Sequence, residues 1–281
     1  MIKIYTPFRN NISDPNKYLY HYTTSNTALQ YILANAELRF SPLNNTNDPK
    51  ESKDWEFNYR LDSNNRDADF PPIADLFKDK LQQHCKVVCF TRDDPKKFKT
   101  GHSLIIHRGY CRPRMWAQYA ENHTGICLVF DKQKLNDSIL SQLKFLGDIY
   151  QGSIKYKDFV GQPDAFSLDC SKILKLGAEE FFNYHTRKYL KPLIFEKQVD
   201  WKSELEYRWA LISASITYEY FSIEEAICGV VLGEDFPENS ISDVLKFTKL
   251  YRIPVVQLEW RNGYPAPTTL EGFTMESKTF A

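Results

Sequence analysis

Short strand-like runs alternate with helical segments along this 281-residue chain, but no regular β-α-β unit repeats. The strand-like runs include Tyr18–Tyr22, Lys86–Thr91 and Gly125–Asp131, and the last is apolar at nearly every position. Chains that mix strands and helices without a β-α-β rhythm favour the α+β class over a doubly wound parallel sheet. We therefore expect an α+β fold.

The chain shows no internal repeat, no low-complexity tract and no linker rich in Gly, Pro or Ser. Apolar residues make up 42% and aromatic residues 15% of the sequence, which argues against disorder. Residues 1–17 are polar and rich in turn formers, so they are predicted to form an N-terminal arm. A single α+β domain is expected over residues 18–281.

Charge and hydropathy limit the partners of the chain. It carries 36 basic and 36 acidic residues, so no attraction of the whole protein for nucleic acid or membrane is expected. No signal-peptide core and no stretch of about 20 apolar residues is present, which predicts a cytoplasmic protein without a membrane partner. The six cysteines are scattered and contain no CxxC pair, so they are predicted to stay reduced.

The common nucleotide, hydrolase and zinc-protease motifs are missing: no P-loop, GxGxxG, GxSxG or HExxH occurs. One remaining candidate is His21-Tyr22-Thr23, at the end of a predicted strand and directly before a capped helix. A His at that place projects from a strand end, where ligands usually bind. The alternative is a half-buried His bonded to a backbone carbonyl.

A second candidate segment combines Arg39, Phe40 and Ser41 with Asn47, Asp48 and Glu51 across a passage from strand to loop. Phe40 alternates with Leu38, so both are expected to face inward. Ordinary turn chemistry explains Asn and Asp in such a loop. Asp48 and Glu51, however, add charge beyond what a turn needs.

A third candidate segment enters a predicted strand at Trp201–Arg208. Glu204 and Glu206 are two residues apart, so on an extended segment they share one face. Two carboxylates held close perturb each other, and one can keep a proton near neutral pH. The alternative is a solvated edge strand on which one of them pairs with Arg208. Upstream, Trp116 and Tyr119 lie on one helical face, a pattern that usually indicates core packing.

These segments together resemble a widespread bacterial family, domain-of-unknown-function family 2971 (DUF2971), over roughly residues 18–232. The resemblance rests on the order of several short motifs. They are Leu19–Thr23, Leu38–Pro42, Asn47-Asp48-Pro49 with Glu51, Cys89-Phe90, Met115–Asp131 and Trp201–Arg208.

A more remote resemblance is to the ADP-ribosyltransferases. Tyr20-His21-Tyr22-Thr23, an Ile-Leu pair in the next helix and then a Leu-Arg strand are similar to the opening of that fold. The resemblance implies a mixed, largely antiparallel, split β-sheet with flanking helices. It also implies that His21 contacts the adenosine ribose of NAD. Glu204-Leu205-Glu206 stands where the family often has Glu-x-Glu, which contacts the nicotinamide ribose.

This second resemblance implies an enzyme that uses NAD as a substrate, without a metal, to modify a nucleic acid or a protein. In such chemistry a carboxylate stabilises the oxocarbenium-like transition state as nicotinamide departs. The expected catalytic residues are Glu206, Glu204 and His21. The residues expected to bind NAD are His21, Tyr22, Thr23, Arg39, Phe40 and Ser41. Those expected to contact the substrate or support the site are Asn47, Asp48, Glu51, Trp116, Tyr119, Trp201 and Arg208.

The similarity is greatest to the DNA-modifying toxin branch and the poly-ADP-ribose polymerase branch, so a bacterial toxin or antiviral defence effector is part of this expectation. Two alternatives remain open. One is a metal-dependent nuclease that holds a divalent ion with Asp48, Glu51, Glu204 and Glu206. The other is a non-catalytic sensor domain with a degenerate nucleotide pocket. The sequence does not indicate an oligomeric state.

Overall fold

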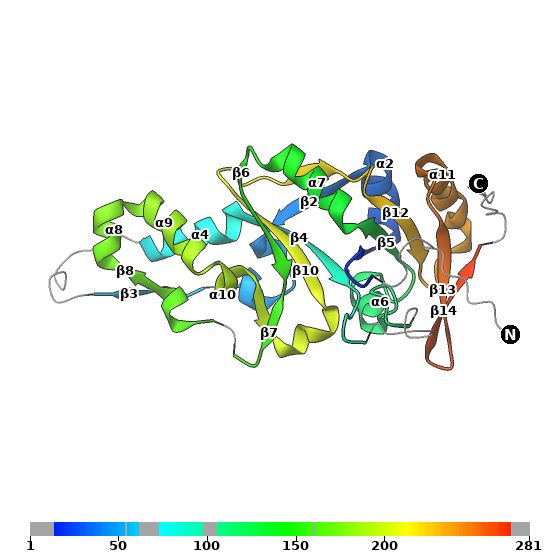
Figure 1. The fold of residues 1–281 in the computed structure, drawn as a ribbon, viewed down its shortest axis with the longest axis horizontal. Helices are drawn as coiled ribbons and strands as arrows, with labels where there is room; N and C mark the ends of the chain where they lie inside the picture. The colour runs from blue at the N-terminus through cyan, green and yellow to red at the C-terminus, as the bar shows by residue number, and fades with distance from the viewer. Residues whose placement is uncertain (1–13, 54, 62–72, 98–105, 160, 271–281) are drawn as a thin grey trace.

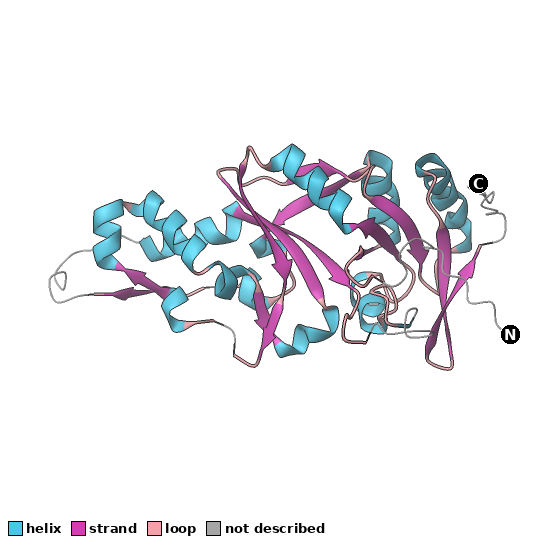
Figure 2. Ribbon diagram, viewed as in Figure 1, coloured by secondary structure: helices cyan, strands magenta, loops and turns pink. Residues whose placement is uncertain are grey.

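An open, largely antiparallel sheet runs through the molecule, with helices on both faces and a helical lobe at one end (Figures 1 and 2). The computed structural model describes residues 14–53, 55–61, 73–97, 106–159 and 161–270. This arrangement confirms the predicted α+β class. Most of the predicted N-terminal arm lies outside the described residues.

The main sheet has the order β11-β2-β4-β1-β5-β12-β13-β14, and β10 and β6 extend from β4. All its pairs are antiparallel except β12 with β13. Its strands are β1 Tyr18–Thr23, β2 Glu37–Pro42, β4 Cys85–Arg92, β5 Ile126–Asp131, β6 Gly147–Ser153, β10 Glu206–Ser213, β11 Glu219–Ser222, β12 Ile227–Leu232, β13 Val255–Arg261 and β14 Tyr264–Thr269. Two small parallel pairs join β3 Asn58–Arg60 to β8 Ser167–Asp169, and β7 Lys155–Lys157 to β9 Glu196–Gln198.

The sheet splits at β4. On one side, β4 pairs with β10 along its whole length. On the other side it pairs with two strands in turn: β2 at Lys86–Val87 and β1 at Thr91–Arg92. The middle of β4 has neither strand beside it on that side, and this gap positions the site described below.

Helical segments cover both faces of the sheet and build the lobe. They are α1 Ser25–Thr27, η1 Ala28–Ile32, α2 Leu33–Asn35, η2 Leu43–Asn45, α3 Pro49–Ser52, α4 Ile73–His84, α6 Pro113–Tyr119, α7 Lys132–Leu143, η3 Pro163–Phe166, α8 Cys170–Leu176, α9 Ala178–Lys188, α10 Leu190–Ile194, η4 Val199–Glu204, η5 Glu238–Ser240 and α11 Ile241–Tyr251. Among the described helices, none is long and apolar enough to cross a membrane.

Strand β5 is buried on both faces, which explains its almost continuous apolar sequence. Leu128 and Phe130 pack into the core that α7 and α11 cover. Cys127 and Val129 point to the other face and pack with Trp116 of α6. A third core fills the helical lobe built by α4, α8 and α9 (Figure 1). In it, Phe77 of α4 contacts Phe182 of α9. All six cysteines are free, as predicted.

The sequence of residues 165–190 predicts one long helix, and this prediction is wrong because the helix is interrupted. A short strand, β8, occupies residues 167–169, and Asp169 then caps α8. Gly177 adopts φ +79 between α8 and α9, a left-handed conformation that glycine reaches without steric cost. The chain therefore turns there, and two short helices replace one long helix.

We predict that the core around β10 carries much of the stability. Trp209 of β10 is fully buried, and its ring contacts Phe90 and Tyr207 with centroid distances of 5.7 and 5.0 Å. Trp209→Ala should lower the free energy of unfolding by about 3–5 kcal/mol in urea denaturation. The matched control is Phe145→Ala, because Phe145 is 76% exposed; it should cost less than about 0.5 kcal/mol. Equal losses in both variants would contradict this assignment of the core.

Candidate functional site

A cavity of about 220 Å³ lies where the sheet splits, between β1, β4 and β10. Its strand residues are Tyr20, His21, Tyr22, Cys89, Phe90, Thr91, Glu206 and Arg208. The short strand β9 supplies Lys197, and helical and loop segments supply Asn45, Thr46, Asn47, Glu51, Met115, Tyr119 and Glu204. The structure therefore brings His21 together with both glutamates of the Glu-x-Glu segment, although they are far apart in the sequence.

His21 bridges the split between β1 and β4. Its Nδ1 lies 3.1 Å from the backbone oxygen of Cys89, beyond the last residue pair that joins the two strands. Burial lowers the pKa of His21, so the ring is neutral at pH 7. A carbonyl can only accept, so Nδ1 carries the proton and Nε2 is left as an acceptor. His21 thus makes the backbone hydrogen bond expected of a structural His and also lines the cavity.

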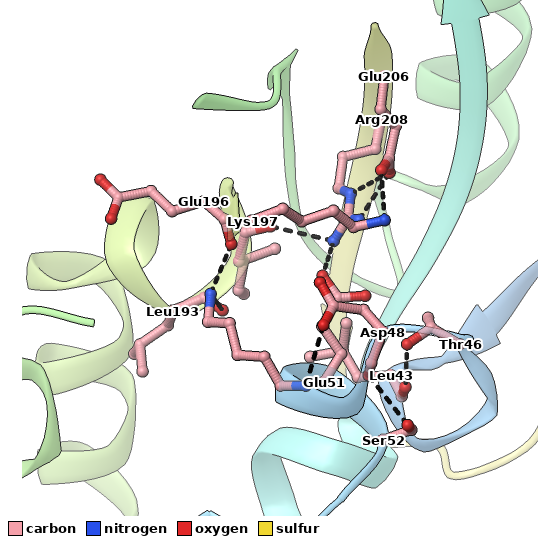
Figure 3. A network of polar contacts seen from close by, with 12 residues as sticks. Leu43, Thr46, Asp48, Glu51, Ser52, Leu193, Glu196, Lys197, Glu206 and Arg208 are labelled. Atoms are coloured by element: carbon pink, nitrogen blue, oxygen red, sulfur yellow. Dashed lines mark hydrogen bonds and ion pairs between the residues drawn. The ribbon is translucent and has the colours of Figure 1, made fainter. Parts of the chain in front are cut away.

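Arg208 forms the centre of a buried ion cluster beside the cavity (Figure 3). Its Nε donates to Glu206 Oε1 at 2.6 Å, and its Nη1 donates to Glu51 Oε1 at 2.6 Å. The same Nη1 donates to the backbone oxygen of Ile194 at 3.0 Å. Arg208 and Glu51 are both fully buried, so these contacts occur away from solvent. The pairing of Glu206 with Arg208 was foreseen, but β10 is an interior strand and not the edge strand of that alternative.

Lys197 is the second cation of the cluster, and the sequence analysis missed it. It lies on β9, and its Nζ is 2.7 Å from Glu206 Oε2 and 3.3 Å from Glu204 Oε2. It stands outside the Trp201–Arg208 segment, and no spacing links it to the two glutamates. The one available signal was chemical, since two neighbouring buried carboxylates require a cation nearby.

The two glutamates converge through a turn and not through strand alternation. Leu205, between them, adopts φ 45 at the end of η4. A left-handed leucine costs roughly 1–2 kcal/mol, and such conformations cluster at functional sites. The expected shared location of Glu204 and Glu206 is therefore present, but the extended geometry from which it was predicted is not.

The surroundings separate the pKa values of these two carboxyl groups. Burial raises the pKa of Glu204; nearby Glu206 adds to the rise, while Lys197 and the Tyr119 hydroxyl at 2.7 Å oppose it. Burial also acts to raise the pKa of Glu206, but the charges of Arg208 and Lys197 outweigh it and lower the pKa to about 2. Glu206 is thus firmly ionised, and Glu204 is the carboxyl that more readily takes up a proton.

The cavity carries surplus negative charge and unsatisfied oxygen atoms. Glu51, Glu204 and Glu206 place three formal negative charges against the two cations Arg208 and Lys197. Glu51 Oε2 and Thr91 Oγ1 are buried and have no hydrogen-bond partner among the described residues. A ligand with a positive charge and hydrogen-bond donors would satisfy both features.

Several predicted site residues lie elsewhere. Phe40 is fully buried in the core against Phe221, and Arg39 is exposed with its guanidinium 4.2 Å from the Tyr218 ring. Ser41 pairs with Val87, away from the cavity end of β4. The predicted contact of these β2 residues with NAD is therefore not supported by their position. The reason is the register, because β2 joins β4 at the end opposite to β1.

Of the residues expected to contact the substrate or support the site, some line the cavity and others do not. Glu51, Asn47, Tyr119 and Arg208 line the cavity. Asp48 and Trp116 do not line it: Asp48 caps α3 by accepting from the backbone N–H of Lys50, and Trp116 packs in the core. Trp201 also lies outside the lining, on η4, with its ring 5.3 Å from Lys197 Nζ. Thr23, which was expected to bind NAD, ends β1 and does not line the cavity either. Asp48 and Trp116 thus have structural roles.

We predict that the two glutamates titrate separately. The side-chain carboxyl carbons can be followed by NMR in ¹³C-glutamate-labelled protein, with Glu204→Gln and Glu206→Gln used for assignment. The Glu206 signal should stay unchanged down to about pH 3, whereas the Glu204 signal should titrate above the ordinary value of about 4.3. Two signals that titrate together near that ordinary value would contradict the described cluster.

Comparison with known proteins gives one match. The model of the family described as Protein of unknown function (DUF2971) matches residues 115–209. No curated protein and no solved structure matches the chain. The matched segment runs from α6 to β10 and includes five residues of the cavity: Tyr119, Lys197, Glu204, Glu206 and Arg208. His21 and Glu51 precede the segment and are not part of the match. The predicted resemblance to DUF2971 over residues 18–232 is therefore matched at residues 115–209.

Proposed function

We propose that this protein is an ADP-ribosyltransferase-like enzyme that uses NAD as a substrate to modify a nucleic acid or a protein. The observation that supports it best is the shared cavity of His21, Glu204 and Glu206. A resemblance to toxins of this kind extends the proposal to a bacterial toxin or antiviral defence effector acting in the cytoplasm.

The charge of the cavity suits the departure of nicotinamide. The nicotinamide ring of NAD is positively charged, and the positive charge moves to the ribose as the bond to the ring breaks. The cavity has one more carboxylate than cations, and these charged side chains are buried, so solvent screens them little. Fixed negative charge in such a place stabilises an oxocarbenium-like transition state.

The different pKa values of Glu206 and Glu204 suggest different roles. In the proposed reaction, the bond from ribose C1′ to the nicotinamide nitrogen breaks, and nicotinamide leaves with the electron pair. Ionised Glu206 faces the positive ribose carbon. A nucleophile of the acceptor then bonds to C1′, and its proton passes to Glu204, whose pKa is raised.

His21 and the aromatic wall would orient the substrate. The Nε2 of neutral His21 can accept a hydrogen bond from a ribose hydroxyl, because its Nδ1 is fixed on Cys89. Tyr22, Phe90 and Tyr119 offer ring surfaces in the same cavity. Its volume, about 220 Å³, is below the roughly 300–1,000 Å³ of pockets for drug-sized ligands. It therefore suits the nicotinamide-ribose end of NAD, with the remainder at the opening.

The alternative of a metal-dependent nuclease is less well supported. It needs Asp48, Glu51, Glu204 and Glu206 around one ion. Arg208 or Lys197 already contacts the three glutamates, and Asp48 faces the first turn of α3. Among the described residues, no group of three potential ligands is arranged to hold a metal.

We predict that Glu206→Gln lowers nicotinamide release from NAD by about a hundredfold or more, because only the transition state loses a stabilising charge. NAD affinity, measured by calorimetry, should change little. The matched control is Glu259→Gln, which alters an exposed ion pair with Arg261 outside the cavity and should retain full turnover.

A chelator distinguishes the alternatives in the same assay. Turnover that survives the chelator and is lost in Glu206→Gln supports the transferase. Full turnover in Glu206→Gln contradicts it, as does chelator-sensitive nuclease activity without NAD cleavage. NAD binding without any turnover would favour the sensor domain.

A further inference from the structure

A second, basic cavity lies directly beside the proposed NAD site. Its volume is about 180 Å³. Lys97, Arg112 and Arg114 contribute three positive charges to its lining, against one negative charge from Asp94. Arg108 also lines the cavity, but it forms an ion pair with Asp93 at 2.8 Å. The whole chain is neutral, so this is a local concentration of positive charge.

The two cavities share two walls. The start of α6 and its N-cap, Arg112–Arg114, line the basic cavity. Met115 and Tyr119 of the same helix line the NAD site. In η4, Ser203 lines the basic cavity and the next residue, Glu204, lines the NAD site. A group bound in the basic cavity is therefore one residue away from the carboxyl proposed to accept the proton.

Arg112 and Arg114 of this wall have no acidic partner among the residues that the structure describes. Arg112 donates only long hydrogen bonds, 3.5 Å each, to the backbone oxygens of Ser203 and Arg92. Arg114 donates to the backbone oxygen of Asp200 at 2.8 Å and to the Ser203 hydroxyl at 3.2 Å. Among the described residues, no carboxylate forms an ion pair with either guanidinium, and the buried Arg112 Nε has no hydrogen-bond partner. Both side chains keep donors available for an anion.

The surroundings of His107 show the same positive field. Burial lowers the pKa of His107, and the charges of Lys97 and Arg112 lower it further, while Asp94 opposes them. A bound anion would reverse part of this effect. Arginine is well suited to such a ligand, because its planar donors match the oxygen atoms of a phosphate.

An aromatic ring completes the surface. Trp201 of η4 is partly exposed, and its ring centroid lies 5.8 Å from the Arg114 guanidinium carbon. Positive charges that follow a backbone, together with an aromatic ring for base stacking, are typical of proteins that bind single-stranded nucleic acid. A protein acceptor would not need this concentration of positive charge beside an aromatic ring.

We propose that the basic cavity binds a backbone phosphate of a single-stranded nucleic acid, with Trp201 stacking a base, and thereby presents an adjoining nucleotide to Glu204. The reaction in this inference rests on the proposed function, whereas the binding of nucleic acid does not. It names nucleic acid, rather than protein, as the acceptor. Arg112 and Arg114 act as positioning residues that hold the phosphate next to the reacting cavity.

Binding without NAD tests this proposal. The probes are fluorescein-labelled oligothymidylate and oligouridylate, measured by fluorescence anisotropy over a range of salt concentrations. The double substitution Arg112→Gln/Arg114→Gln should weaken binding about tenfold or more. It should also reduce the slope of log affinity against log salt by about 1.4, since each lost phosphate contact on a single strand contributes about 0.7.

Two further double variants test whether the loss of oligonucleotide binding is specific to this cavity. Arg187→Gln/Arg261→Gln removes the same charge from exposed arginines away from the cavity and should bind as the wild type does. Arg112→Lys/Arg114→Lys keeps the charge and should keep most of the affinity, which shows that the loss is not misfolding.

Three results would overturn the proposal: no binding by the wild-type protein, equal losses in both Arg→Gln pairs, or weakened NAD binding with unchanged oligonucleotide binding. The last would assign the cavity to the phosphates of NAD. A protein that binds oligonucleotides but does not cleave NAD would refute the proposed function and leave this binding site in place.

Discussion

The buried guanidinium of Arg208 is the interaction on which the site depends. It connects β10, which carries Glu206, to Glu51 of α3 and to the backbone at the end of α10. Removing one partner of a buried ion pair typically costs about 3–5 kcal/mol, because the other charge remains unpaired and desolvated. Strand, loop and helical lobe are thereby held in one arrangement around the cavity.

The same cluster sets the chemistry of the two glutamates. Arg208 and Lys197 keep Glu206 ionised despite its burial, whereas Glu204 shares only Lys197 and has a raised pKa. Neighbouring carboxyl groups with different protonation behaviour are a common basis for acid-base catalysis. The split of the sheet at β4 then gives this pair access to the neutral His21 on the other side of the gap.

Local patterns were enough to predict parts of the fold and of the site. His21 was singled out because it ends a predicted strand, and Glu204 and Glu206 because they are two residues apart; all three line the same cavity. The buried faces of β2 and β5 followed from the alternation and continuity of their apolar residues. These inferences depend on neighbours in the sequence, which the sequence shows directly.

Features set by long-range contacts could not be predicted. The register of β2 on β4 moves Arg39 and Ser41 away from the cavity, and nothing within β2 indicates that register. Lys197 reaches the glutamates from a short strand with no recognisable spacing. The basic residues Lys97, Arg112 and Arg114 are present in the sequence, but the position of their cavity beside Glu204 depends on α6 and η4 coming together.

A crystal structure of the protein soaked or co-crystallised with NAD tests the central claim most directly. We expect the nicotinamide-ribose end in the cavity, with a ribose hydroxyl within hydrogen-bond distance of His21 Nε2 and the ribose C1′ next to Glu206. NAD bound at another place, or a cavity in which His21 and Glu206 no longer face the same ligand, would contradict the account.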